Sequence, residues 1–334
     1  MKKWILAGAA VLVAAVLAVI GYELANGLRP ARGVGFQQIQ IAEADRAPLS
    51  VGLWYPTDAS PRPMLLGWVV QFVARHAPVA GERLPLVVIS HGNGGGPGSH
   101  ADTAVALAAA GFVVAAPMHS GDNFVDQSAV GTSTWLIDRA RHLRLVIDYL
   151  SNTWSERARL DVGRIGVFGF SAGGFTALTM IGAVPDVAAI TRHCARQPEL
   201  ACQLWNPDKA PLPAVDAFVA DDRVRAAVVV APGYGFAFPP DTLTAVTVPV
   251  QLWSGERDTH VPTASNAGLV RASLGDTAQL HIVTGAQHFS FLAPCGLIGP
   301  PPLCREHDGF DRRRFHERFN ADVVAFFRSK LGLY

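Results

Sequence analysis

The stretch that most constrains the fold runs from Gly163 to Gly174 and reads Gly-Arg-Ile-Gly-Val-Phe-Gly-Phe-Ser-Ala-Gly-Gly. Its apolar run, Ile165 to Phe168, is bounded by glycines and is typical of a short, buried, parallel strand. A G-x-S-x-G motif centred on Ser171 follows, and Phe175 to Met180 then has the composition of a helix. A strand, a sharp turn and a helix in this order predict a strained turn that lifts the Ser171 hydroxyl above the edge of a sheet.

The rest of the chain repeats the alternation of strands and helices. Further strands are predicted at Gly33 to Ile41, Leu49 to Tyr55, Pro85 to Ser90, Phe112 to Ala116, Val224 to Val230, Val248 to Trp253 and Gln279 to Val283. Helices are predicted at Ser99 to Ala110, Thr134 to Leu150, Thr263 to Leu274, Asp311 to Lys330 and, within a proline-rich excursion, Leu65 to Ala77. This order predicts an α/β fold, with a mainly parallel central sheet covered by helices on both faces, in one domain over residues 27–334.

One segment, Ala183 to Asp222, breaks this pattern with its prolines and mixed polarity. We expect a small cap-like insertion over the pocket at about residues 183–222.

The four cysteines of the chain fall into two close pairs, Cys194 with Cys202 and Cys295 with Cys304. Four cysteines allow three disulfide connectivities, and the sequence leaves all three open. Local pairing is the simplest of them, because each bond would then close one irregular loop. The spacings do not suit a zinc site, and disulfides are typical of exported proteins.

Residues 1–26 have the composition of a leader outside the fold. Two lysines, Lys2 and Lys3, precede an unbroken apolar run from Trp4 to Ile20. Such a segment is either a signal peptide or an uncleaved membrane anchor. A cut after Ala25 would place Glu23 at the third position before it, which is a poor cleavage site and favours an anchor. With the lysines in the cytoplasm, the body would be exported, either secreted or periplasmic and held in the inner membrane.

A serine hydroxyl is a poor nucleophile until a base takes its proton, so Ser171 needs a histidine and an orienting acid. In enzymes that carry their reactive serine on such a G-x-S-x-G turn, the order along the chain is serine, acid, histidine. Asp258 follows one predicted strand and His288 follows the next. Because the carboxyl ends of parallel strands meet at one edge of a sheet, the sequence predicts a triad of Ser171, Asp258 and His288.

Other residues compete for these roles. Glu256 and Asp241 are alternative acids, and His260 is an alternative base, although it comes too early for the expected order. His119 and Asp122 lie on another loop of the same edge and would either contact the substrate or cap a helix.

The glycine-rich loop His91 to Gly98, after the strand that ends at Ser90, is the expected oxyanion loop. The negative charge on a reacting carbonyl oxygen needs fixed donors, and the backbone N–H groups of Ala172 and Asn93 are the candidates. The loop has no phosphate-binding motif, and we see no metal-ligand set, so no cofactor is expected. The net charge of +1 and the absence of a basic stripe do not indicate binding of nucleic acid.

With these motifs placed, the chain resembles the α/β-hydrolases. More narrowly, it resembles the bacterial branch of predicted dienelactone hydrolases, which is related to the plasma-type platelet-activating-factor acetylhydrolases. Besides the elbow, Leu53-Trp-Tyr-Pro-Thr57 and Gly309-Phe-Asp-Arg-Arg-Arg-Phe-His316 resemble that group. The resemblance implies the triad and oxyanion donors named above. Two departures concern the substrate: true dienelactone hydrolases have a cysteine nucleophile, and Ala231 stands where the acetylhydrolases carry their acid.

The sequence therefore predicts a serine carboxylic-ester hydrolase that acts through an acyl-enzyme on a short-chain or lipid ester. A polyester- or cutin-type esterase and an acyltransferase are the alternatives among enzymes. A non-catalytic envelope binding protein that kept the fold is the alternative from another class.

Overall fold

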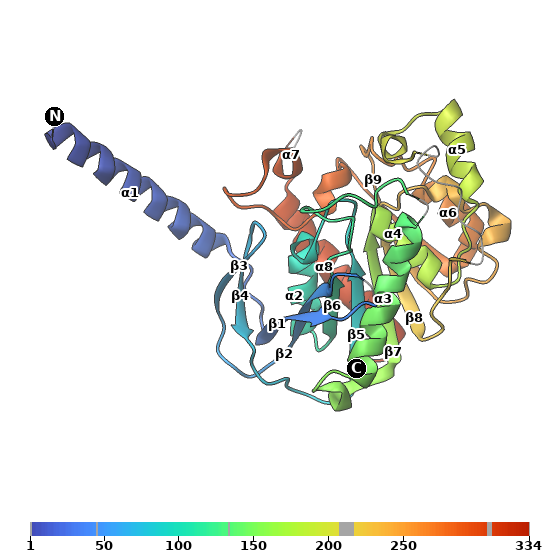
Figure 1. The fold of residues 1–334 in the computed structure, drawn as a ribbon, viewed down its shortest axis with the longest axis horizontal. Helices are drawn as coiled ribbons and strands as arrows, with labels where there is room; N and C mark the ends of the chain where they lie inside the picture. Colours follow the sequence, from blue (N-terminus) through green and yellow to red (C-terminus); the bar gives the residue numbers. More distant parts are fainter. Residues whose placement is uncertain (1, 45, 133, 207–216, 306–308, 334) are drawn as a thin grey trace.

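A ten-stranded, mostly parallel sheet runs through the computed structural model, which describes residues 2–44, 46–132, 134–206, 217–305 and 309–333 (Figure 1). The strand order is β10-β9-β8-β7-β5-β6-β2-β1-β4-β3. The strands are β1 Val34–Ile41, β2 Leu49–Pro56, β3 Arg62–Leu66, β4 Val69–Arg75, β5 Leu84–Ser90, β6 Val113–Pro117, β7 Leu160–Phe170, β8 Val224–Val230, β9 Val250–Gly255 and β10 Ala278–Val283. From β6 to β10 every neighbouring pair is parallel, while β2 joins β1 and β6 antiparallel.

The centre of this sheet is buried on both faces. All residues of β5 and of β9 are buried, and β8 is buried except for one residue. One face carries α2 (Ala101–Ala109) and α8 (Arg312–Leu331), which contact each other, and α3 (Trp135–Asn152) and α4 (Ala172–Met180) form another such pair. Strands covered on both faces read as continuous apolar runs, which is why the sequence showed them clearly. The predicted α/β fold with a mainly parallel sheet is confirmed.

The helix predicted over Leu65 to Ala77 is wrong. The structure has a hairpin there, in which β3 pairs antiparallel with β4 across a turn at Gly67. Gly67 has a φ of +61°, a left-handed conformation that ends any regular element. In β4 the buried residues alternate at first, since Val69, Gln71 and Val73 point inward, and this is the period of a strand.

The segment predicted as an insertion contains α5 (Val187–Arg196) and a short 3₁₀ helix, Leu200–Leu204. Residues 207–216 of this segment lie outside the described residues. A disulfide joins Cys194 to Cys202, and a second joins Cys295 to Cys304, so the local pairing is confirmed. The hydroxyl of Tyr234, from the loop after β8, donates to the carbonyl of Ala201 at 2.9 Å. The segment therefore packs on loops at the carboxyl edge of the sheet.

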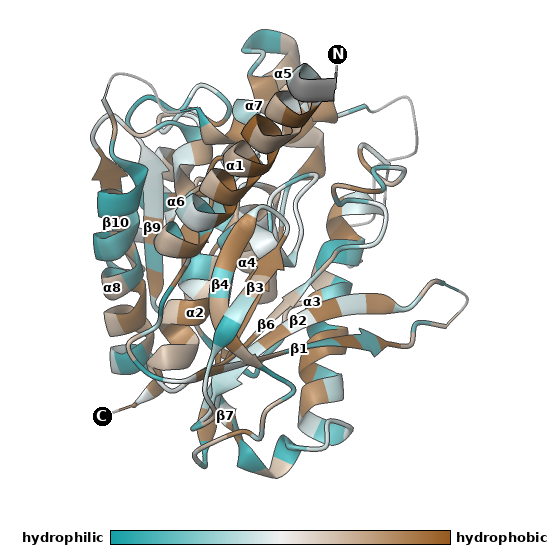
Figure 2. Ribbon diagram, turned by 90° about the vertical axis from the view of Figure 1, so that its left-hand side faces the viewer, coloured by the Kyte–Doolittle hydropathy of each residue, from teal (hydrophilic) through white to brown (hydrophobic). Residues whose placement is uncertain are grey.

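The N-terminal helix, α1 (Lys2–Asn26), projects from the body (Figure 1), and it is mostly exposed and mostly hydrophobic (Figure 2). Its segment Leu6–Asn26 is long and apolar enough to cross a membrane. Most of the leader predicted at residues 1–26 is exposed, but the end of the helix contacts the body. There Glu23 is buried against the body, because its carboxylate accepts the backbone N–H groups of Leu297 and Ile298.

Candidate active site

Ser171 sits at the junction of β7 and α4 in a strained backbone conformation, with φ +56° and ψ −118°. A non-glycine residue adopts such a conformation only where its surroundings enforce it. The two glycines of the motif allow the backbone to pack closely here because they have no Cβ. A Cβ at Gly173 would collide with the carbonyl oxygen of Ser90, and a Cβ at Gly169 would collide with that of Gly173. The turn therefore holds the Ser171 side chain at the carboxyl edge of the sheet.

The structure brings Ser171 together with the predicted acid and base. His288 Nε2 lies 3.0 Å from Ser171 Oγ, and His288 Nδ1 lies 2.7 Å from Asp258 Oδ2. The other oxygen of Asp258 accepts the N–H groups of His260 and Val261 at 2.9 and 3.0 Å. With its Nδ1 proton donated to this buried carboxylate, His288 presents the Nε2 lone pair to the serine hydroxyl.

The alternative acids and base do not reach these positions. Glu256 is exposed, and its carboxylate accepts a backbone N–H of the neighbouring turn at 2.8 Å. Asp241 is also exposed, in the 3₁₀ turn Pro240–Thr242. His260 stacks on the ring of His288 at 5.0 Å between centroids, and burial, followed by the neighbouring His288, lowers its pKa. Of these residues only Asp258 is bonded to His288.

An aromatic ring holds the imidazole of His288 on another side. Phe170, the last residue of β7, lies with its ring centroid 4.7 Å from that of His288, and Phe289 lies 5.5 Å away. Phe170 is the residue immediately before Ser171 in the motif, so its position in the sequence could have indicated a place beside the candidate site. These contacts limit the imidazole to the orientation that faces Ser171.

The expected oxyanion donors come from two different elements. Ala172 is the first residue of α4, where a backbone N–H has no helical carbonyl partner. Asn93 lies on the glycine-rich loop, and its side-chain amide donates to Asp122 Oδ1 at 2.8 Å. The N–H of Gly94 donates to the same oxygen, also at 2.8 Å. Asp122 thereby holds the loop at Asn93 and Gly94, and the backbone N–H of Asn93 stays the predicted second oxyanion donor.

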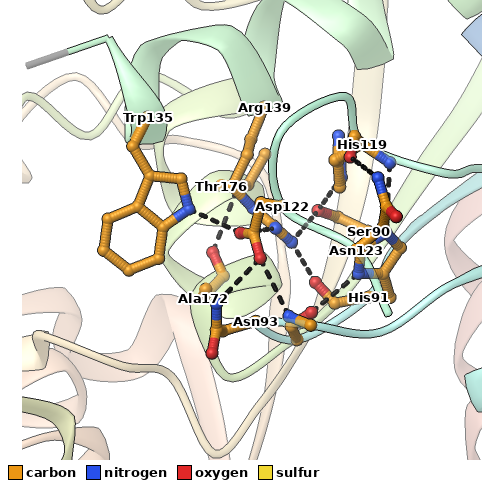
Figure 3. Close-up of polar contacts among 12 residues, drawn as sticks. Ser90, His91, Asn93, His119, Asp122, Asn123, Trp135, Arg139, Ala172 and Thr176 are labelled. Atoms are coloured by element: carbon orange, nitrogen blue, oxygen red, sulfur yellow. Dashed lines mark hydrogen bonds and ion pairs between the residues drawn. The ribbon is translucent and has the colours of Figure 1, made fainter. Parts of the chain in front are cut away.

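Asp122 is the centre of a buried polar network behind this loop (Figure 3). Its Oδ2 accepts the indole N–H of Trp135 and a guanidinium N–H of Arg139, both at 2.5 Å. Arg139 also donates to the carbonyl oxygen of His91 and to Ser90 Oγ, the latter at 3.2 Å. Burial alone would raise the pKa of Asp122, but the charge of Arg139 and the surrounding donors lower it, so the pair is ionic. The expectation that Asp122 contacts substrate or caps a helix is wrong, since it braces the oxyanion loop from behind.

The histidines of this network are neutral supports. His91 Nδ1 donates to the carbonyl of Gly92 at 2.7 Å, and its Nε2 accepts the N–H of His119 at 3.2 Å. Burial lowers the pKa of His91 to about 3 and that of His119 well below its usual value. His91 therefore shapes the turn. His119 is fully buried, with its Nε2 2.9 Å from Ser90 Oγ, so the expected substrate contact is wrong.

Arg139 was missed by the sequence analysis, although a signal was present. It follows Leu136 by three residues and precedes Leu143 by four, so it lies on the apolar face of the predicted helix. An arginine on such a face needs a buried acid.

Within the described parts of the chain, no group of three or more His, Cys, Asp or Glu residues is arranged to hold a metal ion.

A second buried Asp–His pair supports the loop that carries His288. His316, from α8, has Nδ1 2.6 Å from Asp102 Oδ2, and its Nε2 lies 2.9 Å from the carbonyl oxygen of Ser290. Asn320 donates to the same carboxylate oxygen at 2.6 Å. Since Ser290 is two residues after His288, this pair ties the loop of His288 to α2 and α8.

Comparison with known proteins supports the resemblance. Residues 72–218 match the dienelactone hydrolase family. Among solved structures, a ferulic acid esterase from Streptomyces cinnamoneus is similar with a TM-score of 0.64, at 22% sequence identity over 91% of this chain and 92% of that chain. No curated protein matches. The family match includes Ser171 and Asn93 but ends before Asp258 and His288. The chain thus has the α/β-hydrolase fold, and the segment that carries Ser171 is similar to the dienelactone hydrolase family.

Proposed function

We propose that the protein is a serine ester hydrolase that works through an acyl-enzyme, with Ser171, His288 and Asp258 as its triad. The observation that carries this proposal is the hydrogen-bonded row from Asp258 through His288 to Ser171, with distances of 2.7 and 3.0 Å. The strained backbone of Ser171 adds to it, because such strain is common at reactive serines on sharp turns.

The proposed reaction begins when Ser171 Oγ attacks the ester carbonyl carbon while His288 Nε2 takes the hydroxyl proton. Asp258 stabilises the imidazolium that forms and keeps its ring in place. The N–H groups of Ala172 and Asn93 stabilise the oxyanion, and each such donor contributes about 3 to 4 kcal/mol in enzymes where one was removed. His288 then protonates the leaving alcohol, and a water molecule, activated in the same way, hydrolyses the acyl-enzyme.

For the substrate we propose short-chain carboxylic esters or lipid esters. The serine nucleophile argues against dienelactone itself, for which the sequence resemblance leads us to expect a cysteine. The similar ferulic acid esterase makes an aromatic ester worth including in any substrate panel.

The test is hydrolysis of p-nitrophenyl esters, from acetyl to palmitoyl, together with methyl ferulate. We expect Ser171→Ala to lower kcat by roughly 10⁴- to 10⁶-fold without loss of folding. Ser128→Ala, at an exposed serine, is the matched control and should leave the rate unchanged. Labelling with a serine-directed phosphonate checks the nucleophile without any choice of substrate. A wild-type chain that is folded but takes no label would contradict the proposal and favour a binding protein.

A further inference from the structure

The end of α1 is built into the body of the protein. The Glu23 carboxylate is only 8% exposed and accepts the N–H groups of Leu297 and Ile298 at 2.5 and 3.1 Å. A Cβ at Gly296 would collide with this carboxylate, so the loop is shaped to receive it. A leader that is removed after export needs no such contact.

The loop that receives Glu23 is itself constrained. The Cys295–Cys304 disulfide closes it. Arg313, from α8, donates to the carbonyl oxygen of Cys295 at 3.4 Å and to that of Asn26 at 3.0 Å. One guanidinium thus joins the loop to the last residue of α1.

The chain just beyond α1 is fastened to the sheet. The N–H of Leu28 donates to the carbonyl of Val70 at 2.8 Å, and the N–H of Phe72 donates to the carbonyl of Leu28 at 2.9 Å. The guanidinium of Arg29 lies 3.5 Å from the centre of the Phe72 ring. With Glu23 held by one loop and Leu28 held by β4, the direction in which α1 leaves the body is fixed (Figure 1).

The length of α1 sets the depth at which these contacts would lie relative to a lipid bilayer. The apolar segment Leu6–Asn26 has 21 residues. At about 1.5 Å per residue it spans roughly the 30 Å of a bilayer's hydrocarbon core. Glu23 lies in the last turn of this segment, so the loop that binds it would lie at the level of the lipid headgroups.

Exposed apolar side chains lie on the loop and the hairpin that hold the end of α1. Leu297 and Ile298, in the loop that holds Glu23, are 60% and 44% exposed. Leu65, in β3 of the neighbouring hairpin, is 56% exposed, and Phe124 is 65% exposed. Leu66 and Phe124 line one cavity of about 230 Å³, which places Phe124 next to the hairpin. Single exposed apolar residues are ordinary, but a group of them around the end of an apolar helix indicates a membrane-contacting surface.

We propose that α1 is retained as a membrane anchor and that the face formed by Leu65, Phe124, Leu297 and Ile298 lies in the interfacial layer of a lipid bilayer. Glu23 fixes this membrane face relative to α1, so the body is not joined to its anchor by a flexible linker. The loop that carries His288 continues directly into Cys295, and Phe124 packs over Gly96 of the oxyanion loop. Both loops of the candidate active site therefore reach this face.

Retention of α1 is tested by intact mass and N-terminal sequencing of the full chain purified from the membrane fraction. We expect a mature chain that begins at residue 1 or 2 and resists extraction with alkaline carbonate. A mature chain that begins beyond Asn26 overturns the proposal.

The orientation is tested with a fluorescent label on single added cysteines, in the full chain reconstituted into vesicles of phosphatidylcholine and phosphatidylglycerol. Phe124→Cys and Leu65→Cys probe the membrane face. Val162→Cys is the matched control, because Val162 is 48% exposed at the start of β7, away from the carboxyl edge. We expect nitroxide-bearing lipids to quench the first two labels several-fold more than the third. Equal quenching at all three positions overturns the proposed orientation.

The role of Glu23 is tested by Glu23→Ala in the Phe124→Cys background. We expect the protein to stay in the membrane fraction while quenching at Phe124→Cys falls toward that of Val162→Cys. Glu317→Ala, at an exposed acid of α8, is the control and should leave quenching unchanged. Unchanged quenching in Glu23→Ala overturns the assignment of Glu23 as the residue that holds the face on the bilayer.

Discussion

Two buried Asp–His pairs lie close to the candidate active site, and they differ in what the second ring nitrogen meets. In the Asp258–His288 pair, Nε2 faces the hydroxyl of Ser171 at 3.0 Å. In the Asp102–His316 pair, Nε2 faces the backbone carbonyl of Ser290 at 2.9 Å. A hydroxyl can donate a proton, whereas a carbonyl oxygen can only accept one. The first pair can therefore act as a base, and the second can only donate hydrogen bonds.

Neither residue type nor pairing distance separates the two pairs, since the carboxylate contacts are 2.7 and 2.6 Å. What separates them is the element that supplies the third partner. A strained turn delivers a side-chain hydroxyl to His288, and a loop backbone delivers a carbonyl to His316. An Asp–His pair thus indicates catalysis only where a nucleophile completes it.

The largest effect expected from this comparison concerns the two histidines. His288→Ala should lower kcat for ester hydrolysis by roughly 10⁴- to 10⁶-fold. His316→Ala should leave most of kcat in place and instead lower the free energy of unfolding by about 3 kcal/mol or more, because Asp102 stays buried without its main partner. Steady-state rates and urea unfolding of the same preparations measure both.

His316→Gln is the companion variant in case His316→Ala does not fold, because an amide can still donate one hydrogen bond. If a folded His316 variant lost as much kcat as His288→Ala, the distinction between the two pairs would be wrong.

A third buried acid, Asp122, sharpens the comparison because its partner is a guanidinium. Arg139→Met leaves this carboxylate buried without its cation, which should lower the free energy of unfolding by about 3 to 5 kcal/mol. kcat/KM should fall as well, because Asp122 holds Asn93 and Gly94 of the oxyanion loop. Urea unfolding and ester hydrolysis provide the two measurements.

The double variant Asp122→Asn/Arg139→Met removes both charges and is the control. It should be more stable than Arg139→Met alone, because no unpaired charge stays buried. A double variant less stable than the single one would show that the ion pair itself is not the source of the loss.

The parts of the fold that the sequence predicts best are those where local pattern and burial agree. The central strands are apolar throughout because both faces are covered, and Ser171 stands in a motif whose glycines are explained by two close backbone contacts. The hairpin of β3 and β4 was missed because the apolar residues between Leu65 and Ala77 suit a helix in composition. The left-handed conformation of Gly67 and the pairing of β4 with its neighbouring strands make this segment a hairpin, and both depend on tertiary structure.

The candidate site likewise has residues that the sequence predicts and residues that it does not. Asp258 and His288 were predicted because each follows a strand, and strand order alone brings strand ends together. The roles of Asp122, Arg139 and His316 depend on which buried polar groups face each other across the sheet, and spacing along the chain does not contain that information. Glu23 is similar, since its partners lie more than 270 residues away in the sequence.

The smallest effect expected from the comparison is a pH dependence of stability at Asp102. Burial alone would raise the pKa of Asp102, but the charge of His316 and the hydrogen bonds from His316 and Asn320 hold it below its usual value. A lowered folded-state pKa means that ionised Asp102 stabilises the fold fully above the unfolded-state pKa of about 3.9 and that this stability is lost as the pH falls through the folded-state value. Asp102→Asn should therefore cost a constant amount, about 1 to 3 kcal/mol, from roughly pH 7 to pH 5.

Below about pH 3.9 the wild type should lose this advantage and approach the variant. Urea unfolding of both proteins across this range measures the difference, with Glu317→Ala as the control at an exposed acid. A difference that already narrows between about pH 7 and pH 5 would be inconsistent with a depressed carboxyl pKa. It would rule out ionisation of Asp102 as the source of the pH dependence of stability.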